Sequence, residues 1–378
     1  MRAVFLFLLL LMALGVPEQS FVYPVPPPNE VSVQTGIPYM MVKESSLALD
    51  FYRPANAAPK DRFPILVFVN GFGGTWLRDS PQYQAWARAA TAHGLAAVNA
   101  DSNAGSVGEN FDGVVAYLTK HAVELQVDPE RIAVMATSGN VDEGLPLVEN
   151  PQRKTIKAAV FYYGAAEVTQ YRLDLPVLFV RAGLDRPAAN QAFDEMVAAG
   201  LTANAPWTVL NYPSGHHGFD ILDDNDLSRQ TIEQTFRFMQ AVVSESYQAV
   251  LHAGLTEATA AAALARGDYA QAIALYGALA STHPQDFRIL LSYGEALLGG
   301  KQYRAARIQF DRVKVIGGAG PRDLGVPAAE ACALDNDPDA AIAWLKTIPS
   351  RFIPNSLQLD PAFTPLRKRA DFQALFRP

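Results

Sequence analysis

The stretch Arg131-Ile-Ala-Val-Met-Ala-Thr-Ser-Gly-Asn140 decides the fold, because an apolar, β-prone run ends there on a serine, Ser138. Two later stretches have the same form: Phe179-Val-Arg-Ala-Gly-Leu-Asp185 ends on an aspartate, and Tyr212-Pro-Ser-Gly-His-His217 ends on a histidine pair. The carboxyl ends of parallel strands lie at one edge of an open sheet. We therefore expect the serine, the aspartate and one histidine to meet at that edge.

Other apolar runs extend this pattern over the first two thirds of the chain. An alternating run at 46–52 is typical of an antiparallel edge strand, whereas continuous apolar runs suit strands buried on both faces of a parallel sheet. These runs lie at 64–69, 95–98, 131–136, 158–163, 177–180 and 207–210. Helical patterns such as 82–93 and 111–124 separate most of them, and an amphipathic segment at 226–243 follows the last. Strand–helix alternation predicts an α/β fold with a doubly wound, mostly parallel sheet.

Beyond about residue 250 the strands stop, and alanine-rich helical patterns repeat every 34 residues. In each unit an alanine is followed four positions later by an aromatic residue: Ala272 and Tyr276, Ala306 and Phe310, Ala340 and Trp344. This spacing resembles tetratricopeptide repeats, in which the small residue lets two helices approach and the aromatic residue fills the gap to the next unit. The resemblance implies an all-α repeat domain that contacts a protein partner. A generic helical bundle is the alternative.

Composition limits the classes of protein that this chain can belong to. The 378 residues suffice for two folded domains, and 49% apolar with 18% charged residues is typical of globular proteins. A net charge of −7 argues against a surface that binds nucleic acid or anionic lipid. Cys332 is the single cysteine, so no intrachain disulfide can form, and its alanine-rich surroundings predict a small buried apolar residue.

The N-terminus is typical of a secretory signal. Arg2 is followed by an apolar stretch at 3–14, and small residues stand at a plausible cleavage site near 13–15. We predict a signal peptide at 1–15 and an exported protein, periplasmic or secreted; an uncleaved anchor is the alternative. The proline-rich segment 16–45 is expected to form an extended leader. The two domains then occupy 46–250 and 251–378.

Four segments of the first domain carry a resemblance to a known family. They are Asp50-Phe-Tyr-Arg-Pro54, Pro64-Ile-Leu-Val-Phe-Val-Asn-Gly-Phe-Gly-Gly74, Asp128-Pro-Glu-Arg-Ile132 and His217-Gly-Phe-Asp220. The domain resembles α/β-hydrolases of the dienelactone hydrolase and prolyl-oligopeptidase-like esterase type, in which the chain order is also Ser…Asp…His. The resemblance implies a serine carboxylesterase that works through an acyl-enzyme and needs no cofactor. Ser138 would be the nucleophile, His217 its general base and Asp185 the group that orients the imidazole.

The resemblance also implies two backbone donors for the oxyanion of a tetrahedral intermediate. Gly139 would offer its N–H from the start of the helix after Ser138, and Phe72 would offer the other from the glycine-rich loop 70–74. In this family a histidine often stands at the position of Asn70, and an asparagine can make similar bonds that fix the loop. A plain turn after a strand is the alternative for this loop. Residues 163–177 are too few for an inserted lid, so we expect an open site for small or soluble acyl substrates.

Several features leave alternatives open. The usual G-x-S-x-G turn has glycines two positions on either side of the serine, whereas this chain has Ala136 and Asn140. Ser138 could instead be an ordinary helix N-cap. His216 is the alternative to His217, and the pair has no third ligand at a zinc-like spacing, so we expect no metal. A non-catalytic scaffold and a serine peptidase remain as alternative functions, because fold and triad do not specify a substrate.

Overall fold

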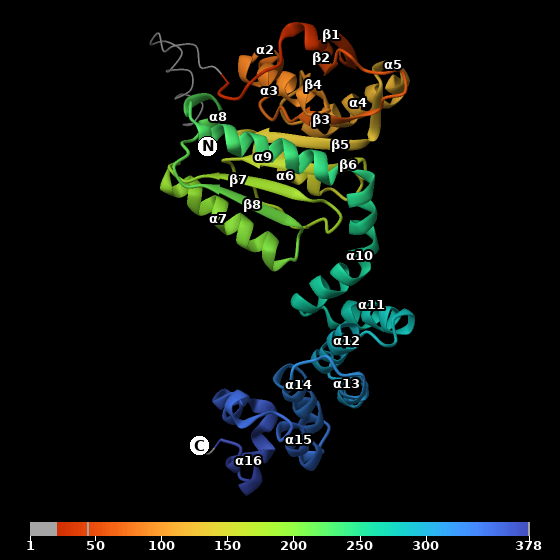
Figure 1. Cartoon of the computed structure of the whole chain (residues 1–378), viewed down its shortest axis with the longest axis vertical. Coiled ribbons are helices and arrows are strands. Elements are labelled where there is room, and N and C mark those ends of the chain that lie inside the picture. Colours follow the sequence, from red (N-terminus) through yellow and green to blue (C-terminus); the bar gives the residue numbers. More distant parts are fainter. Residues whose placement is uncertain (1–20, 44, 377–378) are drawn as a thin grey trace. The chain divides into compact units, whose positions relative to one another are not determined.

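The computed structural model describes residues 21–43 and 45–376, which form two compact units divided between His252 and Ala253. The predicted boundary after residue 250 lies two residues away. The predicted signal peptide at 1–15 lies outside the described residues and stays a prediction. Each unit is treated by itself below (Figure 1).

The N-terminal unit is built on one eight-stranded sheet with the strand order β1-β2-β4-β3-β5-β6-β7-β8. The first two pairings, β1 with β2 and β2 with β4, are antiparallel, and all others are parallel. The strands are β1 (Val31–Val42), β2 (Ser45–Pro54), β3 (Phe63–Phe68), β4 (Ala96–Ala100), β5 (Val127–Thr137), β6 (Ile156–Tyr162), β7 (Val177–Ala182) and β8 (Trp207–Tyr212). The predicted α/β class with a mostly parallel sheet is confirmed.

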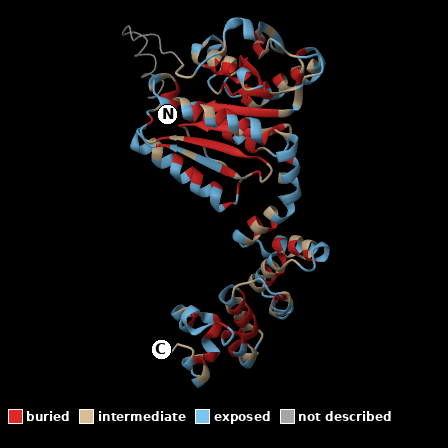
Figure 2. Ribbon diagram, in the orientation of Figure 1, coloured by how far each residue is buried: buried red, intermediate tan, exposed pale blue. Residues whose placement is uncertain are grey.

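Helices cover both faces of this sheet. Side chains of α4 (Val107–Lys120), α6 (Val141–Glu149) and α7 (Pro187–Thr202) pack on one face, and those of α3 (Pro81–Ala92) and α9 (Asp226–Val242) on the other. Short helices α2 (Trp76–Asp79), α5 (Ala122–Leu125) and α8 (Phe219–Leu222) stand at strand ends. The inner strands are buried along most of their length, as continuous apolar runs require (Figure 2).

The prediction of an extended leader over 16–45 is wrong for its second half. After a short 3-10 turn at Pro28–Glu30, the chain enters β1, which forms the edge of the sheet beside β2. Prolines misled the prediction, because an edge strand tolerates Pro38 where a central strand would lose a needed N–H. Gly36, with φ +67°, lies at a register shift in the same strand. The strand predicted at 46–52 is antiparallel as expected, but it is the second strand rather than the edge.

The C-terminal unit is entirely helical over its described residues. Its helices are α10 (Glu245–Ala265, which begins before the unit boundary), α11 (Tyr269–Thr282), α12 (Phe287–Gly299), α13 (Tyr303–Ile316), α14 (Pro321–Leu334), α15 (Pro338–Leu345) and α16 (Ala370–Ala374), with 3-10 turns at Ser350–Phe352, Asn355–Gln358 and Pro361–Leu366. Ala306 and Phe310 are fully buried, and a Cβ at Gly294 would lie 2.4 Å from the Phe310 ring. The repeat residues therefore set the distance between helices.

Cys332 is buried within α14, as predicted for a small apolar residue. Burial raises the pKa of its thiol to about 11, which keeps it protonated and unreactive at neutral pH.

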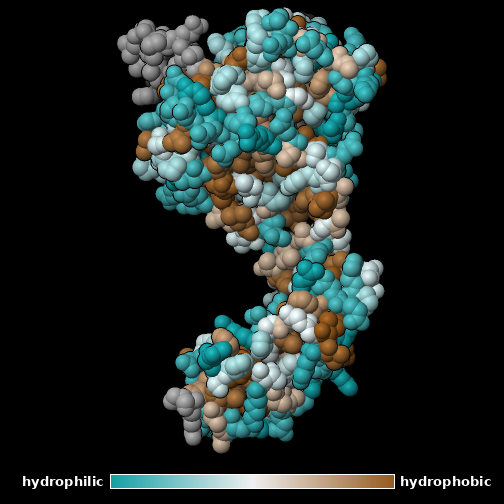
Figure 3. Space-filling model, in the orientation of Figure 1, coloured by the Kyte–Doolittle hydropathy of each residue, from teal (hydrophilic) through white to brown (hydrophobic). Residues whose placement is uncertain are grey.

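Hydrophilic residues cover most of the visible surface of the N-terminal unit, with apolar residues gathered in patches (Figure 3). Among residues 21–43 and 45–376, no helix combines the length and the apolar character that crossing a bilayer requires.

Candidate active site

Ser138 stands at a sharp turn between a strand and a helix. It directly follows β5, opens the short 3-10 turn Ser138–Asn140 and precedes α6. Its φ is +55°, a left-handed conformation that costs free energy for any residue with a Cβ. This is the backbone of a nucleophile elbow, which lifts a serine hydroxyl above the edge of the sheet. An ordinary N-cap residue would instead have an extended backbone.

The structure brings Ser138, His217 and Asp185 into one hydrogen-bonded chain. Ser138 Oγ lies 2.8 Å from His217 Nε2, and His217 Nδ1 lies 2.6 Å from Asp185 Oδ2. The three residues come from the end of β5, the loop before α8 and the loop after β7. They are 32 to 79 positions apart in sequence and meet because the carboxyl ends of the parallel strands β5, β7 and β8 lie at one edge of the sheet.

The surroundings of Asp185 keep it ionised. Its side chain is only 4% exposed, and burial alone would raise its pKa. The hydrogen bond and charge of His217, with the backbone N–H of Arg186 at 2.7 Å, outweigh burial and lower the pKa below its ordinary value. An ionised Asp185 can only accept a hydrogen bond, so it favours the tautomer with the proton on Nδ1 of His217 and leaves Nε2 free to accept the proton of Ser138.

The neighbouring histidine belongs to a different contact. His216 Nδ1 lies 2.9 Å from Asp223 Oδ1, and its backbone N–H donates to Asp223 Oδ2 over the same distance. Its side chain is 59% exposed. Of the two candidates, His217 therefore faces Ser138, and His216 is turned to the surface.

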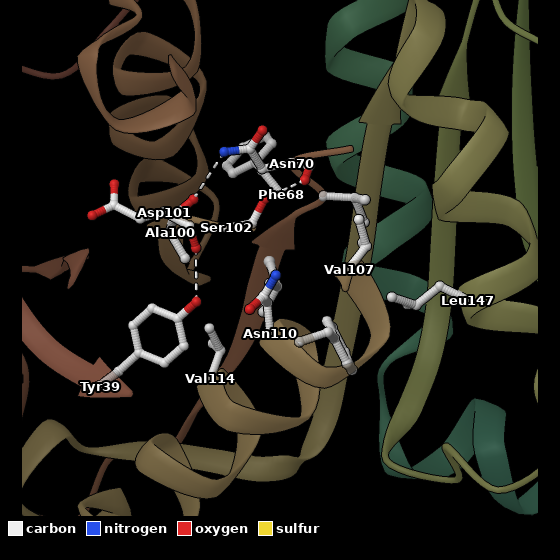
Figure 4. Close-up of a pocket in the computed structure, with 13 residues that line it drawn as sticks. Tyr39, Phe68, Asn70, Ala100, Asp101, Ser102, Val107, Asn110, Val114 and Leu147 are labelled. Atoms are coloured by element: carbon white, nitrogen blue, oxygen red, sulfur yellow. Dashed lines mark hydrogen bonds between the residues drawn. The ribbon is translucent and has the colours of Figure 1, made fainter. Parts of the chain in front are cut away.

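The glycine-rich loop after β3 is held by Asn70. The Asn70 side chain donates to the carbonyl of Gly74 at 3.1 Å and accepts from the Gly73 N–H at 3.1 Å. It also reaches the carbonyl of Ala100 at 3.4 Å, while Ser102 donates to the Asn70 carbonyl beside a small pocket (Figure 4). The pocket has room for about one water molecule, with a volume of about 20 Å³. Asn70 thus makes the bonds that fix the loop, as the sequence suggested for it.

The two residues predicted to supply oxyanion donors are neighbours. A Cβ at Gly139 would lie 2.6 Å from the ring of Phe72, so only glycine lets the loop approach the elbow this closely. The Phe72 ring also packs edge-on against Trp76, with centroids 5.8 Å apart.

The departures from the usual serine turn have a structural explanation. Asn140 has φ −69°, so its position needs no glycine. Its side chain is buried and accepts from the Gly71 N–H at 2.8 Å, which ties the elbow to the glycine-rich loop. Two other glycines, instead of glycines at 136 and 140, let neighbouring segments pack closely around the serine turn. A Cβ at Gly164 would lie 2.4 Å from the Ser138 carbonyl, and one at Gly144 would lie 2.9 Å from the Ala136 side chain.

Sequence reasoning missed two residues around His217 and the role of Asn140 at the serine turn. Tyr163, directly after β6, has its ring centroid 4.7 Å from that of His217 and donates its hydroxyl to Asp220 at 2.6 Å. Asp220 is fully buried. Asn140 was seen only as a departure from a motif. The one sequence feature that could have indicated Asp220 is its place at the end of the segment 217–220. Nothing in that segment indicates that Asp220 bonds Tyr163.

No group of three or more histidine, cysteine or acidic side chains that could hold a metal ion occurs within residues 21–43 and 45–376.

Comparison with known proteins gives the following similarities. A family model for the tetratricopeptide repeat matches residues 263–315. Among solved structures, the chain is similar to esterase 2 of Thermogutta terrifontis (19% identity, 57% of this chain and 96% of that chain, TM-score 0.44), to a bacterial heroin esterase (14%, 65% and 91%, 0.45) and to MGS-M1, an α/β hydrolase enzyme from a Medee basin deep-sea metagenome library (15%, 57% and 99%, 0.47). A search of curated proteins finds no match.

The strand order, the strained serine turn and the repeat match together define the architecture. The chain has an α/β-hydrolase fold followed by helical repeats of the tetratricopeptide type, as its sequence predicted.

Proposed function

We propose that the protein is a serine hydrolase, and specifically a carboxylesterase that works through an acyl-enzyme. The observation that carries the proposal is the unbroken chain of hydrogen bonds from Ser138 Oγ through His217 to a buried Asp185. A serine hydroxyl is a weak nucleophile until a base takes its proton, and this chain supplies the base and the group that orients it.

The geometry supports the following steps. His217 Nε2 takes the proton of Ser138 as Oγ attacks the ester carbonyl, and Asp185 stabilises the imidazolium that forms. The imidazolium then protonates the leaving alcohol, and Ser138 retains the acyl group. In the second half, His217 takes a proton from water, the resulting hydroxide attacks the acyl-enzyme, and the imidazolium returns the proton to Ser138.

The oxyanion of each tetrahedral intermediate would be bound by the N–H groups of Phe72 and Gly139. Two observations support this assignment. The Phe72 ring lies against Gly139, and the side chains of Asn70 and Asn140 bond the backbone of loop 70–74, which contains Phe72. Donors held in place before reaction need no reorganisation when charge develops on the substrate oxygen.

The surroundings of Ser138 favour small, neutral esters with an apolar acyl group. Phe72 lies beside Gly139 and is 43% exposed, and Trp76, which packs edge-on against Phe72, is 39% exposed. Together the two rings would offer an aromatic surface to a substrate. Glu143, whose Cγ lies 3.2 Å from a Cβ placed at Gly71, adds negative charge near the loop and disfavours anionic substrates. Residues 163–176 between β6 and β7, all of them described, form no helix, which supports the proposal of an open site.

We further propose that the helical repeats contact a protein partner, since stacked repeats of this type build extended binding surfaces. Export to the periplasm or beyond remains our proposal from the N-terminal sequence alone.

Two measurements on Ser138→Ala test the proposed activity, using protein that lacks residues 1–15. The wild type should hydrolyse a short p-nitrophenyl ester and be labelled by a fluorophosphonate probe, and the variant should do neither. Circular dichroism serves as the folding control. Equal hydrolysis by both proteins, or a folded wild type that the probe does not label, would contradict the proposal and favour a non-catalytic scaffold.

The proposed substrate class has its own test in Trp76→Ala. Loss of an aromatic contact of this size should lower kcat/KM for a hexanoyl ester about tenfold relative to an acetyl ester. An unchanged ratio between the two esters would remove Trp76 from the acyl site.

A further inference from the structure

We propose that Tyr163 is a positioning residue for His217, with its ring supporting the imidazole and its hydroxyl tying that ring to the buried carboxylate of Asp220. The inference rests on the proposed function, because support for the His217 ring matters to catalysis only if His217 acts as the base. It assigns Tyr163 and Asp220 a part in the reaction that the triad alone does not account for.

The backbone of Tyr163 has an unusual conformation that lets the end of β6 pack against the serine turn. Tyr163 follows β6 as Ser138 follows the adjacent strand β5, and both are non-glycine residues with positive φ, +38° and +55°. Gly164 comes next, and a Cβ there would collide with the carbonyl oxygen of Ser138. The end of β6 is thus fitted beneath the serine turn, in a conformation that a bulky residue adopts only where the surroundings impose it.

The ring of Tyr163 lies against the histidine loop. Its centroid is 4.7 Å from that of His217, with an angle of 54° between the planes, and 5.7 Å from that of Phe219. The face of an aromatic ring attracts a cation that lies over it within about 6 Å of the ring centroid. As the general base, His217 gains a positive charge when it takes the proton of Ser138. The attraction therefore grows as the transition state is approached.

Asp220 holds the ring from behind. Its Oδ1 accepts from the Tyr163 hydroxyl at 2.6 Å, and its Oδ2 accepts from Trp86 Nε1 at 2.8 Å and Gln82 Nε2 at 2.7 Å. Asp220 is fully buried, and the three donors on its two oxygens fix the carboxyl group in place, so the phenol bonded to it is held as well. Because Asp220 is three residues after His217, the same bond closes the histidine loop onto Tyr163.

The phenol remains a donor throughout the working pH range. Burial, followed by the nearby charge of Asp220, raises the pKa of Tyr163 far above its ordinary value.

The other polar groups near His217 have different roles. Asp185 bonds Nδ1 and selects the tautomer, while Ser138 bonds Nε2. The Arg186 guanidinium lies 3.9 Å from Asp185, and Asp223 is engaged by His216. Tyr163 is the aromatic residue that packs on the imidazole ring within the described part of the chain.

Three variants test the proposal. Tyr163→Leu removes the ring, Tyr163→Phe keeps the ring and removes its bond to Asp220, and Tyr162→Phe is the matched control. Tyr162 is the preceding residue and is also buried, and its hydroxyl bonds Thr235 Oγ1 at 2.6 Å instead of Asp220. Its ring stacks on Phe219, and the phenylalanine variant keeps that contact. The readouts are kcat and KM for a short ester across pH, and the pKa of His217 from NMR titration of its labelled Cε1–H.

Tyr163→Leu should lower kcat about two- to thirty-fold with little change in KM, the range expected for losing a cation–π contact. It should also lower the pKa of His217, which moves the acid limb of the rate profile to lower pH. Tyr163→Phe should lower kcat several-fold, whereas Tyr162→Phe should leave kcat and the pKa of His217 unchanged.

A folded Tyr163→Leu protein with the wild-type kcat and the wild-type pKa of His217 would overturn the proposal. Equal losses of kcat in Tyr162→Phe and Tyr163→Phe would do the same, because they would indicate a general effect on the core; this pair also decides the matter if the leucine variant does not fold. Failure of the proposed function is seen separately, as a wild type that fluorophosphonate does not label, and the NMR titration is independent of turnover.

Discussion

Ser138 differs from an ordinary surface serine in its backbone conformation, which has a positive φ that few non-glycine residues adopt. Its φ of +55° exposes Oγ to His217, and the adjacent Gly139 leaves space for the ring of Phe72. At this scale the sequence could indicate residue types and their order along the chain. It could not choose between two adjacent histidines by spacing, because a shift of one residue in a loop leaves the order unchanged.

The choice of histidine gives a prediction at the residue scale. His217→Ala should lower kcat for a short ester by at least about a thousand-fold, because Ser138 loses its base. His216→Ala is the matched control and should change kcat less than about threefold, since His216 bonds Asp223 at the surface. Both are measured on folded protein by steady-state kinetics. The opposite ranking would mean that the loop register is misassigned.

Two elements meet around Asn140, the start of α6 and the loop after β3. The sequence marked this residue as a departure from a glycine pattern, whereas the structure has it in a helical conformation with its side chain bonded to the Gly71 N–H at 2.8 Å. The Tyr83 hydroxyl, which Asn140 also reaches at 3.4 Å, bonds Thr137 in turn. A short polar network therefore joins the serine turn to the glycine-rich loop 70–74, which carries Phe72, one of the two proposed oxyanion donors.

The substitution Asn140→Ala should weaken the attachment of loop 70–74 to the serine turn, because it removes the acceptor of the Gly71 N–H. The half-buried Gly71 N–H would lose its acceptor, which costs about 1 kcal/mol of unfolding free energy. Because the loop then moves more freely relative to Gly139, kcat should fall more than KM rises. Urea unfolding and steady-state kinetics check the two effects. A variant with wild-type kcat would show that the loop is positioned without this bond.

The far end of α6 gives a prediction about pH. Burial raises the pKa of Glu149 to about 7, although the Arg172 N–H and the Trp207 indole donate to it. The folded state therefore holds this proton more tightly than the unfolded chain, whose glutamate has a pKa of 4.5. The resulting stability is fully present below about pH 4.5 and is lost as the pH rises through about 7.

The loss amounts to about 3 kcal/mol of unfolding free energy. Glu149→Gln cannot ionise, so its unfolding free energy should fall less than that of the wild type between pH 5 and pH 8. Urea unfolding of both proteins at each pH gives the slope of unfolding free energy against pH. All other titrating groups contribute equally to the two slopes, so their difference reports Glu149. Parallel slopes would mean that Glu149 does not titrate in this range.

On the scale of the whole molecule, the chain consists of an α/β unit and a helical unit with separate cores. Every residue of the proposed triad and of its supports lies before residue 253. The repeat residues in contrast are used in packing: Phe310 fills the space over Gly294, and Ala272 is fully buried. The hydrolase chemistry and the repeat packing thus use different parts of the sequence.

Truncation after His252 should therefore leave hydrolysis of a small ester within about twofold of the full chain. Binding to a partner, or activity on a larger substrate, should weaken. Thermal unfolding verifies that the truncated protein is folded, and steady-state kinetics compares it with the full chain. A folded truncate without small-ester activity would make the repeats part of the active site.

The sequence by itself determined the features that follow from the periodicity of apolar residues and from residues close together along the chain. It predicted the buried parallel strands, the 34-residue repeat, and the serine, aspartate and histidine placed at strand ends. It failed at β1, because a proline-rich edge strand has no pattern that separates it from a leader.

Only the tertiary structure decided which histidine faces Ser138, what Asn140 bonds, and that Tyr163 and Asp220 close around His217. The physical reason is distance along the chain. Tyr163 and Asp220 are 57 residues apart, and their 2.6 Å hydrogen bond exists because β6 and α8 pack together. Such a contact depends on the register of the sheet and the fit of the core, to which neither residue's own neighbours in sequence give any clue.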